Sequence, residues 1–209
     1  MDLLRVDASI QGSRSASSEL ADLAEAALVS IRPHTRITRR HLGIDPVPAD
    51  AWPHAAAGGF SPEQQRTEAQ QRGLALAGEL ANELRAAEAA ILALPLYNYG
   101  VSQHVKAWID MAIIGGSQGE RFLDGKPVIL ATSRGGAYGP GTPRAGWDHN
   151  TDYLRRIIGE LWGADLTLVE REFTLVGVNP ALDEFTEIAE LMKKDAHQAA
   201  TEAGRALAG

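Results

Sequence analysis

Short apolar runs alternate along the chain with longer segments whose apolar residues recur every three or four positions. The short runs are typical of buried β-strands, and the recurring positions are typical of helices that bury one face. Strands are predicted at Leu3–Val6, Arg36–Leu42, Ala90–Leu94 and Pro127–Ala131, and around Leu166–Val169. Helices are predicted at Leu20–Ile31, Ser61 to about Arg85, Ser102–Ile114, Tyr153–Trp162 and Leu182 to about Leu207.

The second helix has the most specific local start signal. Ser61 could cap the helix, Pro62 would take the first helical position, and Gln64 lies three residues after the cap. The preceding segment, residues 43–60, is rich in Pro, Gly, Ala and Asp. This composition predicts a long loop with at most one helical turn near Trp52.

Strands that alternate with helices imply parallel strands joined by right-handed crossovers. The fold class expected is therefore α/β, a three-layer doubly wound five-stranded parallel sheet with helices on both faces. Residues 1–209 contain no internal repeat, low-complexity block or linker, so a single domain is predicted. Ligands of such sheets bind at the carboxyl ends of the strands, which directs attention to three loops.

Charge and composition exclude several function classes. The chain has 20 basic and 27 acidic residues and a formal net charge of −7, the wrong sign for nucleic-acid binding. It has no cysteine, which removes disulfides, thiolate nucleophiles and thiolate-bound metals. Any redox chemistry would therefore need a borrowed cofactor. No run approaches the roughly 18 apolar residues of a membrane helix, so we expect a cytoplasmic protein without membrane contact.

The first loop, residues 9–18, carries five serines, one glycine and one arginine just before a helix. Free N–H groups and the positive end of a helix dipole attract anions, so a phosphate monoester would fit. The loop lacks the three glycines of a dinucleotide fingerprint and the Gly-Lys-Ser/Thr of a triphosphate loop. Helix capping alone would explain the serines equally well.

The second loop follows the most buried strand and reads Pro95-Leu96-Tyr97-Asn98-Tyr99-Gly100. Its aromatic rings could wall a flat heterocycle, and Asn98 could hydrogen-bond the polar edge of a ring. A simple turn with locally packed tyrosines is the alternative. Further on, Lys106 and Asp110 have the spacing of a surface ion pair, and Trp108 is expected in the core.

The third loop, Thr132-Ser133-Arg134-Gly135-Gly136, places paired glycines directly after a strand. Their backbone N–H groups could face the carbonyl oxygens of a ring, or the glycines could merely allow a tight turn. Residues 137–149 form an unusually long connection, which is typical of a functional loop. The six histidines have no metal-like spacing; only His104 and His149 lie near the expected crevice, as candidates for assisting proton transfer.

With these loops in view, the sequence resembles the flavodoxin-like FMN-dependent NADH:quinone oxidoreductases, also called azoreductases. The resemblance rests on Ala8-Ser9-Ile10 with Ser15-Ala16-Ser17, on Pro95–Tyr99 followed by Val105–Asp110, and on Thr132–Gly136. It implies a strand order of 2-1-3-4-5. It also implies that the cofactor is FMN and that the residues binding it are Ser9, Ser15, Ala16, Ser17, Pro95, Leu96, Tyr97, Asn98, Tyr99, Ser133, Arg134, Gly135 and Gly136.

In such a protein the serines would hold the FMN phosphate, residues 96–99 would contact the isoalloxazine ring, and residues 133–136 would border its pyrimidine side. The function implied is two-electron, ping-pong transfer from NADH or NADPH to quinones or azo compounds. A homodimer with active sites at the interface is implied too. Two alternatives remain open: an FMN-binding electron carrier without its own NAD(P)H reaction, and a flavin-free protein that binds a phosphorylated metabolite.

The chain departs from the usual family pattern at several positions. It has Leu96 and Tyr99 where Met and Phe are frequent, Ala16 where a more polar residue is common, and Ser102 where proline is frequent. The connection 115–126 is short, although it keeps one aromatic residue, Phe122. Because that connection helps to wall the substrate pocket in the family, these departures bear on substrate preference.

Overall fold

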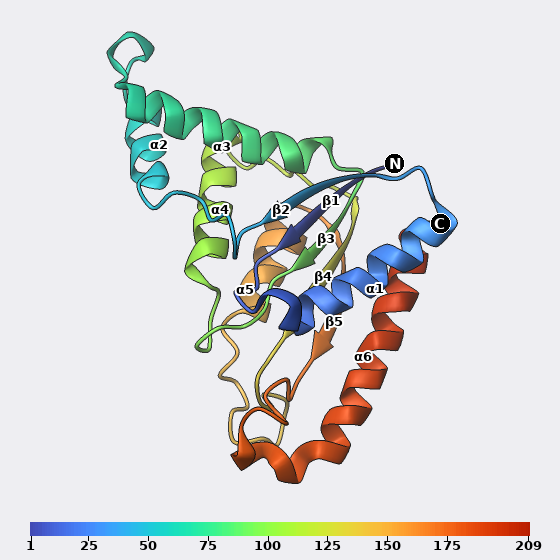
Figure 1. The fold of residues 1–209 in the computed structure, drawn as a ribbon. Coiled ribbons are helices and arrows are strands. Elements are labelled where there is room, and N and C mark those ends of the chain that lie inside the picture. Colours follow the sequence, from blue (N-terminus) through green and yellow to red (C-terminus); the bar gives the residue numbers. More distant parts are fainter.

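The computed structural model describes residues 1–209 and contains a five-stranded parallel sheet of order β2-β1-β3-β4-β5 (Figure 1). The strands are β1 (Asp2–Asp7), β2 (Arg36–His41), β3 (Ala89–Ala93), β4 (Pro127–Ser133) and β5 (Asp165–Arg171). All five lie where the sequence predicted them. The predicted doubly wound α/β fold and its strand order are confirmed.

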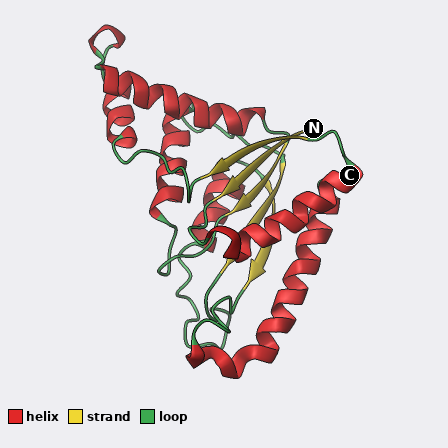
Figure 2. Cartoon of the chain, viewed as in Figure 1, coloured by secondary structure: helices red, strands yellow, loops and turns green.

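Helices cover both faces of the sheet, as Figures 1 and 2 show. On one face, α1 (Ala16–Ile31) packs against α6 (Thr186–Ala206). On the other face lie α3 (Glu68–Ala86), α4 (Gln103–Gly115) and the short α5 (Thr151–Leu154), while α2 (Ala51–Gly59) packs on α3. None of these helices combines the length and the apolar character that crossing a bilayer requires.

The helix α2 corrects the prediction of a long loop at residues 43–60. Its Ala51 and Ala55 are buried, and a Cβ on Gly73 of α3 would lie only 2.8 Å from the Ala55 nitrogen. Proline is tolerated in the first turn of a helix because N–H groups there have no intrahelical acceptor. Close packing on α3 therefore stabilises a segment whose composition alone indicates a loop.

The start of α3 was also predicted wrongly. The cap is Thr67, whose hydroxyl accepts from the Gln70 N–H at 3.3 Å, while the Gln70 side chain accepts from the Thr67 N–H at 2.9 Å. The Ser61 segment instead forms only a single 3₁₀ turn at Glu63–Gln65, after an extended Pro62. Both segments carry capping signals, and only the one at the start of the long apolar face begins the helix.

Two apolar clusters, one on each face of the sheet, form the core. On the α3–α5 face, Trp162 meets Trp108 and Phe122 edge to face, with ring centroids 5.5 and 5.7 Å away. A π-helix, Arg155–Leu161, continues α5 and ends at Trp162. On the other face α1 and α6 approach so closely that a Cβ on Gly204 would meet the Ala24 oxygen at 2.0 Å. The predicted core position of Trp108 is confirmed.

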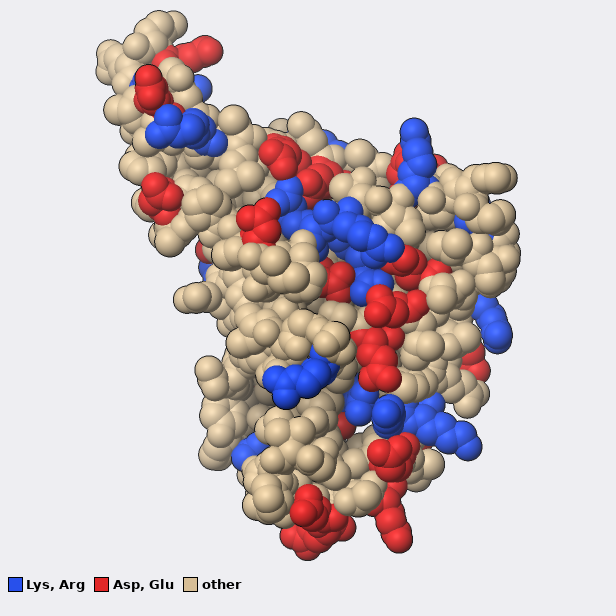
Figure 3. Space-filling model, in the orientation of Figure 1, with Lys and Arg blue, Asp and Glu red and all other residues tan.

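The edge strand β2 carries charged rather than apolar residues. Arg36 pairs with Asp2 at 2.6 Å, and Arg40 contacts Glu83 at 2.6 Å and Glu79 at 2.7 Å. In Figure 3, basic and acidic side chains interleave over this part of the molecule. Charge on an edge strand discourages pairing with another sheet.

Candidate functional site

A cavity of about 620 Å³ opens at the carboxyl ends of β1, β3 and β4. This size lies within the usual range for small-molecule sites. We call it the carboxyl-end cavity. It is lined by Ser9, Gln11, Arg14, Ala16, Glu19, Pro95, Leu96, Tyr97, Asn98, Tyr99, Ser133, Gly135, Tyr138, Arg144, Arg171, Thr174, Leu175 and Val178. The three loops singled out in the sequence therefore meet in one place.

The first loop forms the serine side of this cavity, made of Ser9, Gln11, Arg14 and Ala16. Ser15 caps α1 by accepting from the Ser18 N–H at 3.1 Å, and its hydroxyl lies 3.3 Å from that of fully buried Ser17. Ser15 and Ser17 are not lining residues themselves but flank Ala16, which is. The sequence left helix capping and anion binding open as explanations of these serines; the cap is confirmed, and the anion site stays a prediction.

Donors at the start of α1 are free to bind an anion. The N–H groups of Ala16 and Ser17 donate no hydrogen bond within the chain, as expected for the first helical positions. They lie at the positive end of the helix dipole. The guanidinium of Arg14 contacts only the neutral Gln11 side chain, at 3.4 Å. The serine side thus combines neutral and cationic donors without a carboxylate bound to Arg14.

The second loop is a tight turn tied to the first. The Ile10 N–H donates to the Tyr97 hydroxyl at 3.0 Å, and the Ser9 hydroxyl lies 3.2 Å from the same oxygen. Tyr97 and Gly100 exchange backbone hydrogen bonds of 3.1 and 3.0 Å. Tyr97 therefore joins two loops across the top of β1 and β3, a role that sequence spacing did not indicate.

The turn itself is strained. Asn98 and Tyr99, its two central residues, have φ values of 46° and 69°. Two successive left-handed residues define a type I′ turn, in which a bulky non-glycine residue is an outlier. Such strain costs of order 1–3 kcal/mol per residue and concentrates at functional sites. The turn presents Asn98, whose amide makes no hydrogen bond within the chain, to the cavity.

The third loop offers backbone donors. The Leu96 N–H donates to the Ser133 oxygen at 3.0 Å, which holds the second and third loops side by side. The Gly135 and Gly136 carbonyls accept from Leu175 and Phe173, whereas their own N–H groups donate to nothing in the chain. A Cβ on Gly135 would lie 2.6 Å from the Leu175 Cδ1. A side chain at position 135 would therefore require the exposed Leu175 side chain to move.

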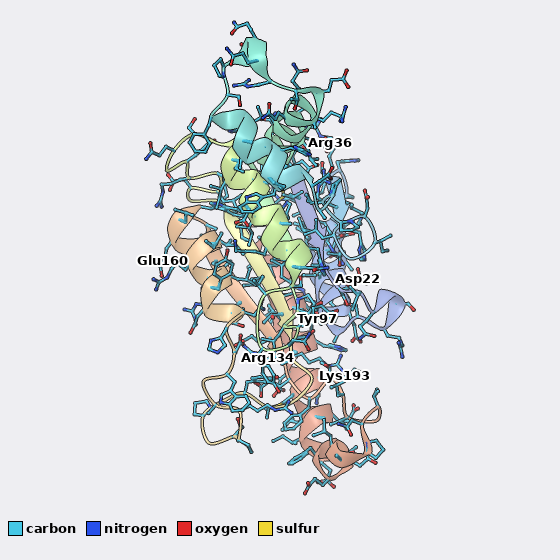
Figure 4. All side chains as sticks on the ribbon, turned by 90° about the vertical axis from the view of Figure 1, so that its left-hand side faces the viewer. Asp22, Arg36, Tyr97, Arg134, Glu160 and Lys193 are labelled. Atoms are coloured by element: carbon cyan, nitrogen blue, oxygen red, sulfur yellow. The ribbon has the colours of Figure 1, made fainter.

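The Arg134 side chain does not line the carboxyl-end cavity, and its expected place among the cofactor contacts stays a prediction. Its guanidinium donates hydrogen bonds to Asp148 at 2.6 Å, to Thr151 at 3.0 Å and to Glu170. A further contact to Glu172 measures 3.4 Å. In Figure 4, Arg134 lies near Tyr97 at the end of the sheet where β3 and β4 finish. Its side chain anchors the loop whose glycines line or flank the cavity.

Two pKa values reflect this network. Burial alone lowers the pKa of Arg134, but the charges of Glu170 and Asp148 and their hydrogen bonds outweigh it and raise the pKa. Burial alone raises the pKa of Asp148, but hydrogen bonds from Thr151 and Asn150 and the charge of Arg134 hold it below its usual value. Both groups are therefore charged at neutral pH.

Neither candidate histidine lines the carboxyl-end cavity. The His104 Nε2 lies 2.6 Å from the carbonyl oxygen of Ala8, so this ring holds the start of α4 against the end of β1. His149 has an exposed side chain, and its backbone N–H donates to the Tyr99 oxygen at 2.9 Å. A role for either in proton transfer has no support from these contacts.

Several lining residues were missed from sequence. Tyr138 and Arg144 come from the long connection, Arg171 ends β5, and Thr174 and Leu175 follow it. The length of the connection 137–149 had marked it as functional, but no local motif singled out these two residues. The residues after β5 carried no signal at all, because only the tertiary fold brings them beside Gly135.

Comparison with known proteins identifies the family. A family model described as flavodoxin-like fold matches residues 1–197. An FMN-dependent NADH:quinone oxidoreductase of Frankia alni is 39% identical over 194 residues, which cover 90% of this chain and 92% of that protein. The chain belongs to this family. A Frankia casuarinae protein of the same name is 37% identical over 203 residues, covering 95% of this chain and 96% of that protein.

Solved structures of the family share the fold. An azoreductase from Bacillus anthracis superposes with a TM-score of 0.77 and 18% identity, covering 99% of each chain. An FMN-dependent NADH-azoreductase from the same species, solved in complex with FMN, gives a TM-score of 0.73 at 18% identity and covers 100% of this chain and 99% of that one. At this identity the likeness concerns the fold alone.

Proposed function

We propose that this protein is an FMN-dependent oxidoreductase that passes two electrons from NADH or NADPH to quinones or azo compounds. The observation that carries the proposal is the carboxyl-end cavity, which joins the start of α1, where Ala16 has an unpaired N–H group, to a strained aromatic turn and to Gly135, whose N–H group is also unpaired. The names of the family relatives support the same activity.

The serine side suits the phosphate of FMN. The N–H groups of Ala16 and Ser17 and the hydroxyl of Ser9 would hold its oxygens, with Ser15 and Ser17 fixing the start of the helix. Anions bind at helix starts because the free donors and the helix dipole act together. Arg14 would add a cationic donor that no carboxylate of the chain engages.

The aromatic side, made of Leu96–Tyr99, Gly135, Tyr138 and Arg144, suits the ring system. Leu96 would supply an apolar contact, the Asn98 amide would bond the polar edge of the ring, and the Gly135 and Gly136 N–H groups would face its carbonyl oxygens. The bound flavin supplies hydride acceptance and release, which no side chain of a cysteine-free chain can perform.

The chain itself would place the reactants and stabilise negative charge. Backbone N–H groups fixed by the fold stabilise charge without having to reorganise. With a quinone, the balanced reaction converts NADH, one proton and the quinone to NAD⁺ and the hydroquinone. Because neither His104 nor His149 lines the cavity, we expect that proton to come from water rather than from a side chain.

A homodimer with the cavity at its interface remains part of this proposal. Exposed apolar side chains surround the cavity, among them Ile10, Tyr99, Leu175 and Val178, of which Ile10 and Val178 are 64% and 68% exposed. Light scattering after size exclusion should give twice the mass of the chain. The cytoplasmic location stays a prediction, which fractionation of cells that express the protein would test.

The decisive experiment adds FMN to the purified protein and follows flavin fluorescence. We expect saturable binding, reduction of the bound flavin by NADH in anaerobic stopped flow, and reoxidation by menadione or an azo dye. FMN binding without reduction by NADH would favour an electron carrier instead. Absence of FMN binding would favour a flavin-free protein that recognises a phosphorylated metabolite at the serine side.

A further inference from the structure

Arg144 stands at the mouth of the carboxyl-end cavity with its charge uncompensated. Its guanidinium carbon lies 5.7 Å from the centroid of the Tyr138 ring and 6.0 Å from that of Tyr99. It is exposed, it forms no ion pair, and its side chain donates no hydrogen bond within the chain. The two tyrosine rings therefore hold the cation over the aromatic side while its N–H donors stay free.

The charges around the cavity differ from those of the whole chain. Arg14, Arg144 and Arg171 line it together with a single carboxylate, Glu19, which pairs with Arg171 at 2.7 Å. The chain as a whole carries a net charge of −7. A cavity with two uncompensated arginines in an acidic protein attracts anions selectively.

The two free arginines lie in different parts of the cavity. Arg14 belongs to the serine side, where the phosphate of the proposed cofactor would use it. Arg144 belongs to the aromatic side, with Tyr99 and Tyr138. The oxidised flavin ring carries no charge for it to pair with, so before the flavin is reduced an anion that pairs with Arg144 belongs to a reactant.

We propose that the electron acceptor this enzyme prefers is a planar aromatic compound with a sulfonate or carboxylate directly on its ring, and that Arg144 sets this preference. The inference rests on the proposed function. The ring of such an acceptor packs near Tyr99 and Tyr138 while its anionic group bonds the guanidinium. The pyrophosphate of NADH is a poorer match, because a ribose separates it from the nicotinamide ring, whereas the cation here lies within 6.0 Å of both aromatic centroids.

The experiment compares a matched pair of acceptors, 1,4-naphthoquinone-2-sulfonate and menadione, with wild type and Arg144→Gln. We expect Arg144→Gln to lower kcat/KM for the sulfonate about fivefold relative to menadione, the effect of losing one exposed ion pair. Arg144→Lys should restore most of the preference because it keeps the charge. Arg156→Gln, which removes an exposed cation that does not line the cavity, controls for net charge.

A binding measurement separates affinity from turnover. Naphthalene-2-sulfonate and the neutral naphthalene-2-sulfonamide, neither of which is reducible, are titrated by calorimetry into the oxidised FMN-loaded protein. The sulfonate should bind several times more tightly, and Arg144→Gln should remove the difference. The advantage should also shrink when ionic strength rises from about 0.01 M to about 0.15 M, since the Debye length falls from about 30 Å to about 8 Å.

Several outcomes would overturn the inference. Equal losses for both quinones in Arg144→Gln would mean that the arginine acts on the cofactor, and a loss confined to reduction by NADH would mean that it binds the nucleotide. Equal binding of the two naphthalenes by wild type would also contradict it. Menadione turnover by wild type tests the proposed function separately, so a failure of the acceptor preference leaves that result standing.

Discussion

Arg134 and Arg144 lie on the same connection between β4 and α5, yet their surroundings are opposite. The Arg134 guanidinium is nearly buried and bonded to Asp148, Glu170, Glu172 and Thr151. The Arg144 guanidinium is exposed, lies beside Tyr99, Tyr138 and the Gly136 backbone, and has no carboxylate partner. The charge of a buried cation must be compensated by groups of its own chain. An exposed cation is solvated by water and stays available to bind a ligand. The first therefore shapes the site and the second is free to select what enters it.

The largest effect should come from Arg134→Met, which leaves three carboxylates without their shared cation. We expect a loss of about 3 kcal/mol in the free energy of unfolding, because breaking a buried ion pair leaves uncompensated charge. Urea titration followed by circular dichroism measures it. FMN affinity should fall as well, since the loop with Gly135 and Gly136 loses its anchor. A change below about 0.5 kcal/mol would show that the network is not structural.

A pH titration of stability should reveal the same network. The pKa of Asp148 is lower in the folded protein than its ordinary 3.8. Its contribution to the free energy of unfolding is therefore complete above about pH 4. That contribution is lost as the pH falls through the lowered folded-state pKa. Asp148→Asn should therefore flatten the dependence of unfolding free energy on pH in the acid range. An unchanged slope would contradict the assignment.

A smaller effect is expected from Gly135→Ala, which lies between the two arginines. The new Cβ would come within 2.6 Å of the Leu175 Cδ1, and because that exposed side chain can move aside, we expect a loss of at most about 1 kcal/mol in the free energy of unfolding. FMN affinity, measured by fluorescence, should fall with it. The double variant Gly135→Ala/Leu175→Ala should recover FMN affinity relative to the single variant. If it does not, the strain lies elsewhere than in this contact.

The smallest effect on stability should be that of Arg144→Gln. An exposed arginine without an ion pair contributes within about 0.5 kcal/mol to folding. Thermal unfolding should therefore be unchanged within that margin. Similar losses of unfolding free energy in Arg144→Gln and Arg134→Met would contradict this prediction, because Arg144 would then be a structural residue too.

Local patterns sufficed for much of the fold. The apolar run 90–94 is short and has no polar face, so it could only be a central strand, and Trp108 on a helical stripe could only be core. The ion pair of Lys106 with Asp110, at 2.7 Å, likewise follows from their spacing. These features depend on neighbours in sequence or on burial alone, which composition and period report directly.

Other features depended on contacts distant in sequence. Residues 51–59 became a helix because Ala55 packs on Gly73, and Thr67 rather than Ser61 caps the helix that carries the apolar face. The direction of Arg134 was decided by carboxylates on β5 and just after it. No local pattern specifies which of two similar capping signals begins a helix in the folded protein. Nor does a local pattern specify to which side of its loop a side chain points.

The amino-acid sequence by itself determined the five strands, their helical crossovers and the three loops that carry serines, aromatics and paired glycines, because period and turn chemistry are local properties. Only the tertiary structure decided that Tyr97 ties two of those loops together, that Arg134 turns away from the cavity and that Arg144 stands at its mouth. Those placements follow from contacts between residues that are far apart in sequence, which are a property of the whole packed chain.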